Sequence, residues 1–403
     1  SLQMRFIVES CELTGLPIRT LPGIQEMVSA TEALPKLRDL SIEDLLGREK
    51  IEMDWNEVQI GLTNKIILVT GGGGSIGSEL CLQISKLKPS KMIIFERSEF
   101  NLYKIEKTLS KIEVSVEYIL GDLCDLDKVD NVFKSFSPEL TFHAAAYKHV
   151  PILERDAREA IRNNILGTKN VADTASKYDC SRFILISTDK AVNPTNVLGA
   201  TKRLAELYIE LINKSSKTNF ITVRFGNVLD SDGSVVPLFK EQINTGGPIT
   251  VTDPEITRYF MTIREASQLI LQASKMGVGG EIFVLDMGEP VKIKYLAEQM
   301  IRLSGLEPNK DIFIEYSGLR PGEKMYEELF YSDEIREKTQ HKKILLAMHS
   351  TISIKDLDIK IDNMINSLDE FDNEKQKSLL KEIVPFLDEK INYNITSANE
   401  YKK

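Results

Sequence analysis

A glycine-rich turn between a buried strand and a helix most constrains the fold of this chain. The apolar residues 66–70 are followed by Gly-Gly-Gly-Gly-Ser-Ile-Gly at 71–77 and by a helical pattern over 78–87. A glycine motif alone is a weak indicator, but strand, glycine turn and helix in this order form the context of a dinucleotide-binding fingerprint. Such a turn lets the backbone approach a pyrophosphate, which the N-terminus of the helix attracts. The predicted contacts to the dinucleotide in this segment are Gly71, Gly74, Ser75, Ile76 and Gly77.

Apolar segments that predict buried strands alternate with helical patterns along the first half of the chain. The predicted strands are 66–70, 92–95, 114–120, 139–142, 183–186 and 220–225. This alternation predicts the α/β class, with a doubly wound parallel sheet whose ligands bind at the carboxyl ends of the strands. After Gly226, turn formers, short strands expected at 249–252 and 257–261, and helices at 265–274 and 293–303 predict a smaller mixed α/β lobe.

These patterns divide the chain into four predicted parts. Residues 1–60 have too few apolar positions for a core of their own, and they are interpreted as an extension, the remnant of a preceding domain plus a linker. Residues 61–226 form the predicted dinucleotide-binding domain, and residues 227–348 form a substrate lobe interleaved with it. Residues 349–403 are charged and helical, which predicts an appendage that packs on the rest or binds a partner.

Charged and small residues after the later strands predict the rest of the dinucleotide site. Glu96 lies about 20 residues beyond the glycine turn, where a carboxylate binds the adenosine ribose of NAD, whereas the neighbouring Arg97 would receive the 2′-phosphate of NADP. NAD is preferred here, with NADP as the alternative. Asp122 is placed near the adenine, or it caps the helix predicted over 125–136. The further predicted contacts are Leu123 and the small residues Ala144, Ala145 and Ala146, which would let a flat cofactor ring lie against the backbone.

A run of polar residues follows the predicted strand at 183–186 and precedes a helix predicted over 202–212. It contains Thr188, Asp189 and Lys190, at the edge of the sheet where ligands bind. Asp189 and Lys190 would act as an acid and a base only if burial or neighbours hold Asp189 protonated and Lys190 neutral. An ordinary surface ion pair is the alternative. Lys202 lies one turn inside the following helix.

Basic and polar side chains beyond the fourth strand are candidates for substrate binding. Arg258, Arg320 and Lys324 fit a diphosphate, because guanidinium groups bind phosphate through two parallel hydrogen bonds. A solvated surface position is the alternative for each of them. The other candidates are Lys148, Asn227, Ser234, Val235 and Glu323.

Composition excludes several functional classes. Lys and Arg number 51 against 60 Asp and Glu, for a net charge of −9, so neither nucleic acid nor a membrane surface is an expected partner. The four cysteines form no Cys-x-x-Cys pair, and His143 and His149 have no acidic or cysteine partners at metal-binding spacing, so local hydrogen bonds and no metal site are expected. No apolar run reaches the roughly 18–20 residues of a membrane span, which predicts no membrane contact, and the scattered cysteines favour a reducing compartment, the cytoplasm.

Three motifs together resemble those of the extended short-chain dehydrogenase/reductases: Thr70-Gly71-x-x-Gly74-x-x-Gly77, Ser187-Thr188-Asp189-Lys190 and Arg224-Phe225-Gly226-Asn227. The chain is most similar to the nucleotide-sugar 4,6-dehydratases that act on UDP-N-acetylglucosamine in bacterial polysaccharide and glycoprotein-glycan synthesis. Residues 37–48 are similar to the segment that precedes this domain in the large, membrane-anchored branch. The resemblance implies a homo-oligomeric soluble part, on the cytoplasmic side, of a longer inner-membrane protein.

The resemblance implies a lyase reaction that depends on NAD. Hydride leaves C4 of the sugar, water leaves across C5–C6 and the hydride returns to C6, with Asp189 as the proton donor to the departing hydroxyl and Lys190 as the base at C5. Lys202 would orient the nicotinamide ribose. Leu198 stands where the superfamily's Tyr-x-x-x-Lys pair has its tyrosine, so Thr188 is the nearest polar substitute at the 4-hydroxyl. Relatives that invert C5 generally keep the tyrosine, which predicts retention at C5.

Two other functions remain open. A UDP-hexose or UDP-N-acetylhexosamine 4-epimerase would use the same cofactor and substrate class, but it would not need the Asp189–Lys190 pair. A dinucleotide-sensing protein that has lost catalysis together with the tyrosine is the other alternative. The retained Lys202 and the Asp189–Lys190 pair argue against it.

Overall fold

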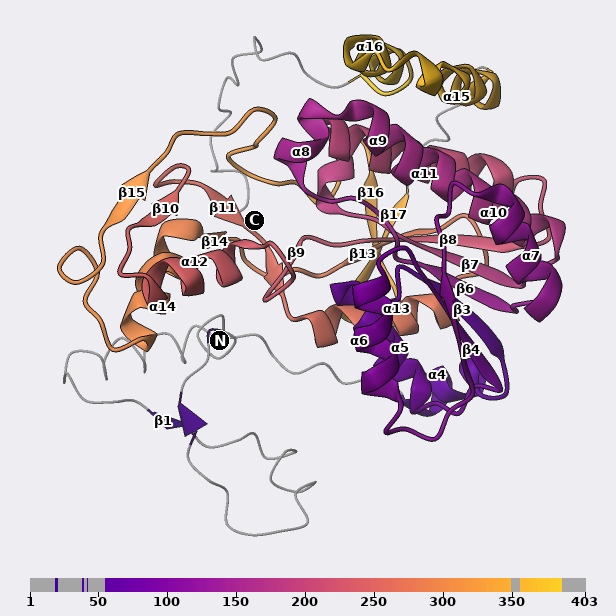
Figure 1. The fold of residues 1–403 in the computed structure, drawn as a ribbon, viewed down its shortest axis with the longest axis horizontal. Coiled ribbons are helices and arrows are strands. Elements are labelled where there is room, and N and C mark those ends of the chain that lie inside the picture. The colour runs from indigo at the N-terminus through magenta and orange to yellow at the C-terminus, as the bar shows by residue number, and fades with distance from the viewer. Residues whose placement is uncertain (1–18, 21–37, 40–41, 43–54, 349–355, 386–403) are drawn as a thin grey trace.

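The computed structural model of this chain describes residues 19–20, 38–39, 42, 55–348 and 356–385 (Figure 1). Strands β1 (Arg19–Thr20) and β2 (Arg38–Asp39) pair in antiparallel fashion. The rest of the predicted extension up to residue 54, which includes most of the segment 37–48, lies outside the described residues. Within the described part of the chain, no helix is both long enough and apolar enough to span a membrane.

A nine-stranded sheet organises the structure, in the order β16-β17-β13-β8-β7-β6-β3-β4-β5 (Figure 1). The strands from β13 to β5 pair in parallel, whereas β17 and β16 add an antiparallel edge. The bounds are β3 Ile66–Thr70, β4 Lys91–Glu96, β5 Val116–Leu120, β6 Leu140–His143, β7 Arg182–Ile186, β8 Asn219–Arg224, β13 Ile282–Leu285, β16 Ile335–Lys338 and β17 Ile344–Met348. The predicted doubly wound parallel sheet is therefore confirmed.

Helices cover both faces of the sheet, because the central strands are apolar on both (Figure 1). Leu68 in β3 packs on one face, while its neighbours Ile67 and Val69 pack on the other, as the two-residue period of a strand requires. The helices on the face of Leu68 are α7 (Leu126–Phe136), α9 (Ala157–Ile161), α10 (Gly167–Lys177) and α11 (Val197–Asn213). Those on the opposite face are α4 (Trp55–Leu62), α5 (Ser75–Ser85), α6 (Glu99–Leu109) and α13 (Ile263–Met276).

A π-helical turn, Arg162–Leu166, interrupts the helix between α9 and α10. The side-chain oxygens of Asn163 and Asn164 both accept from the amide of Tyr147, at 3.1 and 2.8 Å. The side-chain amide of Asn164 also donates to the Tyr147 carbonyl at 3.1 Å. Turns of this kind are frequent at functional sites. Here the turn fixes the loop that leaves the carboxyl end of β6.

The second lobe is built mainly from residues that follow β8. Its helices are α12 (Val235–Asn244) and α14 (Ile293–Leu303), and its strand pairs are β9–β12 (Asn227–Val228, Phe260–Met261), β10–β15 (Ile249–Val251, Ile314–Tyr316) and β11–β14 (Thr257–Arg258, Val291–Lys292). The prediction of a helix at 293–303 is confirmed. The helix predicted at 265–274 lies within α13, but it packs on α5 under the main sheet and not in this lobe.

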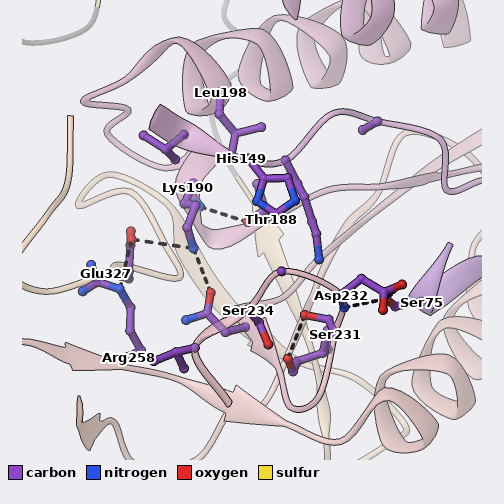
Figure 2. A pocket seen from close by; sticks show the side chains of 18 of the residues that line it. Ser75, His149, Thr188, Lys190, Leu198, Ser231, Asp232, Ser234, Arg258 and Glu327 are labelled. Carbon is purple, nitrogen blue, oxygen red and sulfur yellow. Dashed lines mark hydrogen bonds and ion pairs between the residues drawn. The ribbon is translucent and has the colours of Figure 1, made fainter. Parts of the chain in front are cut away.

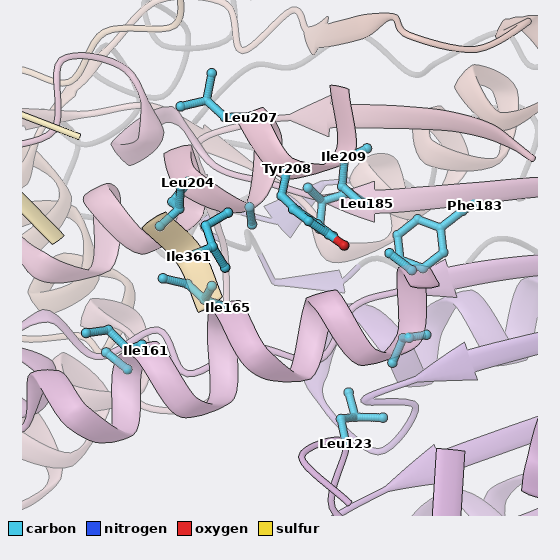
Figure 3. Packing of buried hydrophobic residues seen from close by; sticks show 14 of the residues in the cluster. Leu123, Ile161, Ile165, Phe183, Leu185, Leu204, Leu207, Tyr208, Ile209 and Ile361 are labelled. Carbon is cyan, nitrogen blue, oxygen red and sulfur yellow. The ribbon is translucent and has the colours of Figure 1, made fainter. Parts of the chain in front are cut away.

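The C-terminal appendage, as far as it is described, packs on the main domain (Figure 1). Helices α15 (Leu357–Asn366) and α16 (Asn373–Ile383) join the apolar cluster of α9 and α11. Ile361 of α15 lies with Leu204 and Ile165 in this cluster (Figure 3). The Asn373 side-chain oxygen also caps the amide of Ala157 at 2.6 Å. These contacts support the packing interpretation of the appendage.

Candidate active site

A cavity of about 660 Å³ lies between the carboxyl edge of the sheet and the second lobe, within the size range of small-molecule sites. Many of the predicted site residues line it: Gly74, Ser75, Ile76, Gly77, Ala144, Ala146, Lys148, Thr188, Lys190, Leu198, Lys202, Asn227, Ser234, Val235, Arg258, Arg320 and Glu323. Other predicted residues are not among its lining: Gly71, Glu96, Arg97, Asp122, Leu123, Ala145, Asp189 and Lys324. The loops after β3, β6, β7 and β8 therefore meet the second lobe at one place.

The glycine turn has the shape of a phosphate cradle. Gly71 adopts a φ of +66°, and a Cβ on it would lie 2.7 Å from the backbone of Ala145. A Cβ on Gly77 would lie 2.0 Å from the Gly71 carbonyl oxygen, so the helix can begin this close to the strand only with glycine there. Helix α5 begins at Ser75, earlier than predicted, and no side chain caps its first amides. Those free amides lie beside the cavity and can bind an anion.

The residues predicted to bind the adenosine end are held by protein contacts. Glu96 accepts hydrogen bonds from the amides of Gly73 and Ser98, both at 2.9 Å, so its carboxylate clamps the glycine turn. Arg97 hydrogen-bonds the hydroxyl of Tyr147 and stacks over that ring. The guanidinium of Arg97, the predicted contact for the 2′-phosphate of NADP, remains about half exposed.

One of the two alternatives for Asp122, the helix cap, is wrong. Asp122 does not cap α7; Asp125 does, by accepting from the amide of Lys128 at 3.0 Å. Asp122 instead accepts from Arg162 at 3.0 Å. The side chain of Leu123 is buried in the apolar cluster under α7, so a cofactor contact at this residue would have to be made by its backbone.

Lys202 and Leu198 lie one turn apart on α11, and both line the cavity. The ammonium of Lys202 donates to the Ile186 carbonyl at 2.7 Å. Burial lowers the pKa of Lys202 to about 8, although the carboxylate of Glu206 partly opposes this shift. The structure thus places an apolar side chain at the usual tyrosine position and, one turn away, a lysine that is still mainly a cation at pH 7.

Thr188, Asp189 and Lys190 share one carboxylate oxygen. Asp189 Oδ1 accepts from Thr188 Oγ1 at 2.9 Å and from Lys190 Nζ at 3.0 Å. Lys190 Nζ also donates to Asn227 Oδ1 at 3.0 Å (Figure 2). The carboxylate of Asp189 is fully buried behind its two neighbours. It therefore cannot touch a substrate hydroxyl directly, which corrects the predicted role of Asp189 as the donor to that hydroxyl.

The expectation of a neutral Lys190 is also contradicted. Burial lowers the pKa of its ammonium, but the carboxylates of Asp189 and Glu327 outweigh that effect, and the pKa of Lys190 is raised above its ordinary value. Lys190 is therefore a cation at neutral pH. A cation can donate a proton to a leaving group, but it cannot remove one from carbon.

The predicted diphosphate clamp is brought together only in part. Arg258 lines the cavity, but its guanidinium already donates to the carbonyl of Thr257 at 2.7 Å and to Glu323 at 3.1 Å. Arg320 lines the cavity and is exposed. Lys324 points away from it, because its ammonium donates to the Val192 carbonyl at 2.9 Å. Lys324 thus fixes the segment after residue 320 to the loop that follows Lys190.

The two histidines behave differently. The ring of His143 is buried and is hydrogen-bonded to Thr70 at 2.8 Å and Thr168 at 2.9 Å, as predicted. The ring of His149 lines the cavity and packs on Gly233, where a Cβ would lie 2.5 Å from it (Figure 2). Among the described residues, no group of His, Cys, Asp or Glu side chains is arranged to hold a metal ion.

Glu327 is a cavity residue that sequence reasoning missed. Its carboxylate lies 3.6 Å from Lys190 Nζ and 3.8 Å from Arg258 Nε (Figure 2). In the sequence it is one of two adjacent glutamates in a charged segment, a pattern typical of a solvated surface. Only the tertiary fold distinguishes it from its exposed neighbour Glu328.

The parallel sheet, the glycine cradle and the lysine on the helix after β7 define the class of extended short-chain dehydrogenase/reductases. Residues 67–349 match the family model described as polysaccharide biosynthesis protein, and the chain belongs to this family. It is 49% identical over 361 residues to the capsular polysaccharide biosynthesis protein CapD of Staphylococcus aureus. This match covers 89% of the chain and 60% of CapD, so the chain spans about 60% of the length of that relative.

Similar proteins carry two different enzyme names. The chain is 36% identical to the UDP-glucose 4-epimerase of Rickettsia bellii, over 68% of the chain and 79% of that relative. It is 34% identical to the inverting UDP-N-acetylglucosamine 4,6-dehydratase of Campylobacter jejuni, over 67% of the chain and 78% of that relative. The X-ray structure of Pen from Bacillus thuringiensis matches with a TM-score of 0.68 and 33% identity, over 76% of this chain and 98% of Pen.

Proposed function

We propose that this chain catalyses the NAD-dependent 4,6-dehydration of UDP-N-acetylglucosamine to UDP-2-acetamido-2,6-dideoxy-4-keto-hexose, with C5 retained. One observation carries the proposal: Lys190, a cation beside the cavity, lies within reach of the carboxylates of Asp189 and Glu327. Moving a hydride to and from a sugar needs no such group, whereas losing a hydroxyl as water needs a proton donor. The name of the Campylobacter relative supports the substrate. Leu198, in place of tyrosine, supports retention.

A dinucleotide fits the half of the cavity next to the main sheet. The glycine turn and the uncapped amides of α5 would hold its pyrophosphate, and the small residues Ala144 and Ala146 leave room for a flat ring. When bound, NAD supplies reversible hydride transfer. Glu96 would act at the adenosine end through the turn that it clamps, while Arg97 leaves NADP as the alternative cofactor.

The chain's own side chains would carry the protons. Thr188 Oγ1 would take the proton of the sugar 4-hydroxyl while passing its own to Asp189 Oδ1, to which it already donates. Lys190 Nζ would donate to the departing 6-hydroxyl and recover a proton from the same Asp189 oxygen, 3.0 Å away. The proton lost from the 4-hydroxyl is thus the one that leaves in water. The ammonium of Lys202 would stabilise the negative charge that develops at the 4-oxygen.

An epimerase is the second candidate, because the Rickettsia relative carries that name. The two activities differ in the product: a dehydratase gives a nucleotide sugar lighter by one water, and an epimerase gives an isomer of unchanged mass. Incubation of the purified chain with UDP-N-acetylglucosamine, followed by mass and proton spectra of the product, tests the proposal. A product of unchanged mass would favour the epimerase, and an inverted C5 would contradict retention.

The membrane anchoring and the assembly of the full-length protein are also proposals. We infer, from the similarity of residues 37–48 to the segment that precedes this domain in the membrane-anchored branch, that the full-length protein is anchored in the inner membrane, with this part on the cytoplasmic side; we also propose that it is a homo-oligomer. Cross-linking of the full-length protein in membrane fractions tests both.

Removing the Glu96 carboxylate is expected to weaken dinucleotide binding. In Glu96→Ala, the amides of Gly73 and Ser98 lose an ionised acceptor, and each such bond contributes about 1.5–3 kcal/mol. We expect Kd for NAD to rise about tenfold or more, measured by titration calorimetry. Glu99→Ala, at the exposed start of α6, is the control. An unchanged Kd in Glu96→Ala would refute this role.

The reduction step is expected to slow at alkaline pH. The pKa of Lys202 lies at about 8 in the folded chain, so its cation is present below pH 8 and is lost as the pH rises through 8. If the cation stabilises the 4-oxygen, the rate of nicotinamide reduction should fall by up to tenfold per pH unit above 8. Single-turnover absorbance from pH 6 to pH 10 measures it. A rate that rises through pH 8 would instead make neutral Lys202 a base.

A further inference from the structure

Glu327 lies in the wall of the cavity, on the segment between β15 and β16. Its side chain is 4% exposed, and its Oε1 faces both Lys190 and Arg258 at ion-pair distances of 3.6 and 3.8 Å (Figure 2). Both distances exceed the length of a hydrogen bond. The two cations therefore face this oxygen without forming hydrogen bonds to it.

The other oxygen of this carboxylate has no partner. Oε2 of Glu327 is buried and accepts no hydrogen bond from any residue in the described part of the chain. A buried acceptor without a donor costs about 1–3 kcal/mol, and such atoms are rare in folded proteins. Because Glu327 lines the cavity beside Lys190, its carboxylate has acceptor capacity that no described protein group uses.

The proposed dehydration lacks a base at C5, and this inference rests on that proposed function. Lys190 is a cation and Asp189 does not reach the cavity. Glu323 also lines the cavity, but its two oxygens accept from Arg258 at 3.1 Å and from the amide of Arg320 at 3.2 Å. Asp232 lies at the glycine-turn side, where its amide and carboxylate contact Ser75.

We propose that Glu327 is the catalytic base that removes the C5 proton. The C5–H bond breaks, the proton moves to the Glu327 carboxylate, and the electron pair forms the C5–C6 double bond. The C6–O bond breaks, and the oxygen takes a proton from Lys190 Nζ to leave as water. The Glu327 carboxyl exchanges its proton with solvent while the unsaturated intermediate is bound, and it protonates C5 when hydride returns to C6. Because one carboxyl removes the proton and delivers another on the same face, C5 keeps its configuration.

Hydrogen exchange at C5 isolates this step. The purified chain, with NAD and UDP-N-acetylglucosamine in D₂O, is expected to give a product that carries deuterium at C5. In Glu327→Gln, nicotinamide reduction should persist, turnover should fall about 10²-fold or more, and neither product nor recovered substrate should carry deuterium at C5. Glu328→Gln is the matched control, because Glu328 is half exposed and contacts Lys324 and Asn193 instead. It should exchange and turn over like the parent.

The variant Lys190→Gln tests whether Glu327 is itself the base or only supports Lys190. This variant loses the proton donor, so water should not leave, but recovered substrate should still gain deuterium at C5. Deuterium exchange at the parental rate in Glu327→Gln would overturn the proposal. If Glu327→Gln does not fold, Glu327→Asp provides the test, because its carboxylate is set back by one methylene. Slowed but persistent exchange would support a carboxylate base at this position. Exchange at the rate of the unsubstituted chain would oppose the proposal. If the unsubstituted chain never dehydrates the substrate, the proposed function is refuted instead.

Discussion

Replacing Arg224 by methionine is expected to lower the free energy of unfolding by about 3–5 kcal/mol, the usual cost of removing one partner from a buried ion network. Arg224 is fully buried at the end of β8. It donates two hydrogen bonds to Glu206 of α11, at 2.9 and 2.8 Å, and two to Glu334, at 2.8 and 3.0 Å. Without it, two carboxylates are left in the interior without their main counter-charge.

The same network sets the pH range of this stabilisation. Burial raises the pKa of Glu206, but the charge and hydrogen bonds of Arg224 and the charge of Arg203 outweigh this and lower it from 4.5 to about 2. A carboxyl whose pKa is lowered on folding contributes stability above its unfolded pKa. That contribution is therefore complete above about pH 4.5 and is lost as the pH falls towards 2. The difference between the parent and Arg224→Met should shrink over the same range.

An exposed ion pair provides the control for this prediction. Lys240 pairs with Asp230 at 2.8 Å, but the two side chains are 55% and 50% exposed. Lys240→Met should therefore change stability by less than about 1 kcal/mol. Urea unfolding followed by circular dichroism compares the variants. Equal midpoints for Arg224→Met and Lys240→Met would show that the buried network does not stabilise the fold.

The parallel sheet could be predicted because local sequence specifies it. The runs at 66–70, 92–95 and 183–186 are apolar on both faces, and each is followed by a turn and a helix, so this alternation predicts a parallel, doubly wound sheet. The helix at 265–274 was placed wrongly because its apolar face is compatible with either lobe. Only the tertiary contact of α13 with α5 decides between them. The antiparallel edge strands likewise depend on tertiary pairing, because β17 pairs with β13 and β16 pairs with β17. No local sequence pattern predicts these pairings.

The site was predictable where backbone geometry dictates residue type, and less so where charges interact. The close approach of Gly71 and Gly77 to neighbouring backbone leaves a signature in the sequence. By contrast, Asp189 and Lys190 are adjacent in sequence but differ in position. The Asp189 carboxylate is buried behind the cavity, whereas the Lys190 side chain lines it. The pKa of Lys190 is raised in part by Glu327, more than a hundred residues away along the chain, through a contact of 3.6 Å. A sequence shows which groups can titrate, but not which of them meet.

The shared oxygen of Asp189 leads to the second large effect. If the proton of the 4-hydroxyl passes through Thr188 to Asp189, then Thr188→Val and Asp189→Asn should both slow nicotinamide reduction. General acid–base groups typically contribute 10²–10⁴-fold, so a loss of that order is expected in each. Valine has no hydroxyl to relay the proton, and the asparagine amide oxygen cannot take it up. Both substitutions nearly preserve shape, so packing changes little.

Lys190→Gln should behave in the opposite way, because it acts after oxidation. Glutamine keeps an N–H donor for Asp189 and Asn227 but has no proton to give to the departing hydroxyl. Nicotinamide absorbance should therefore rise at the parental rate and then persist, since the 4-keto intermediate is not dehydrated. Stopped-flow absorbance in a single turnover separates the two groups of variants. If Asp189→Asn reduced the cofactor at the parental rate, Asp189 would act only at the dehydration step, and the relay from Thr188 would be wrong.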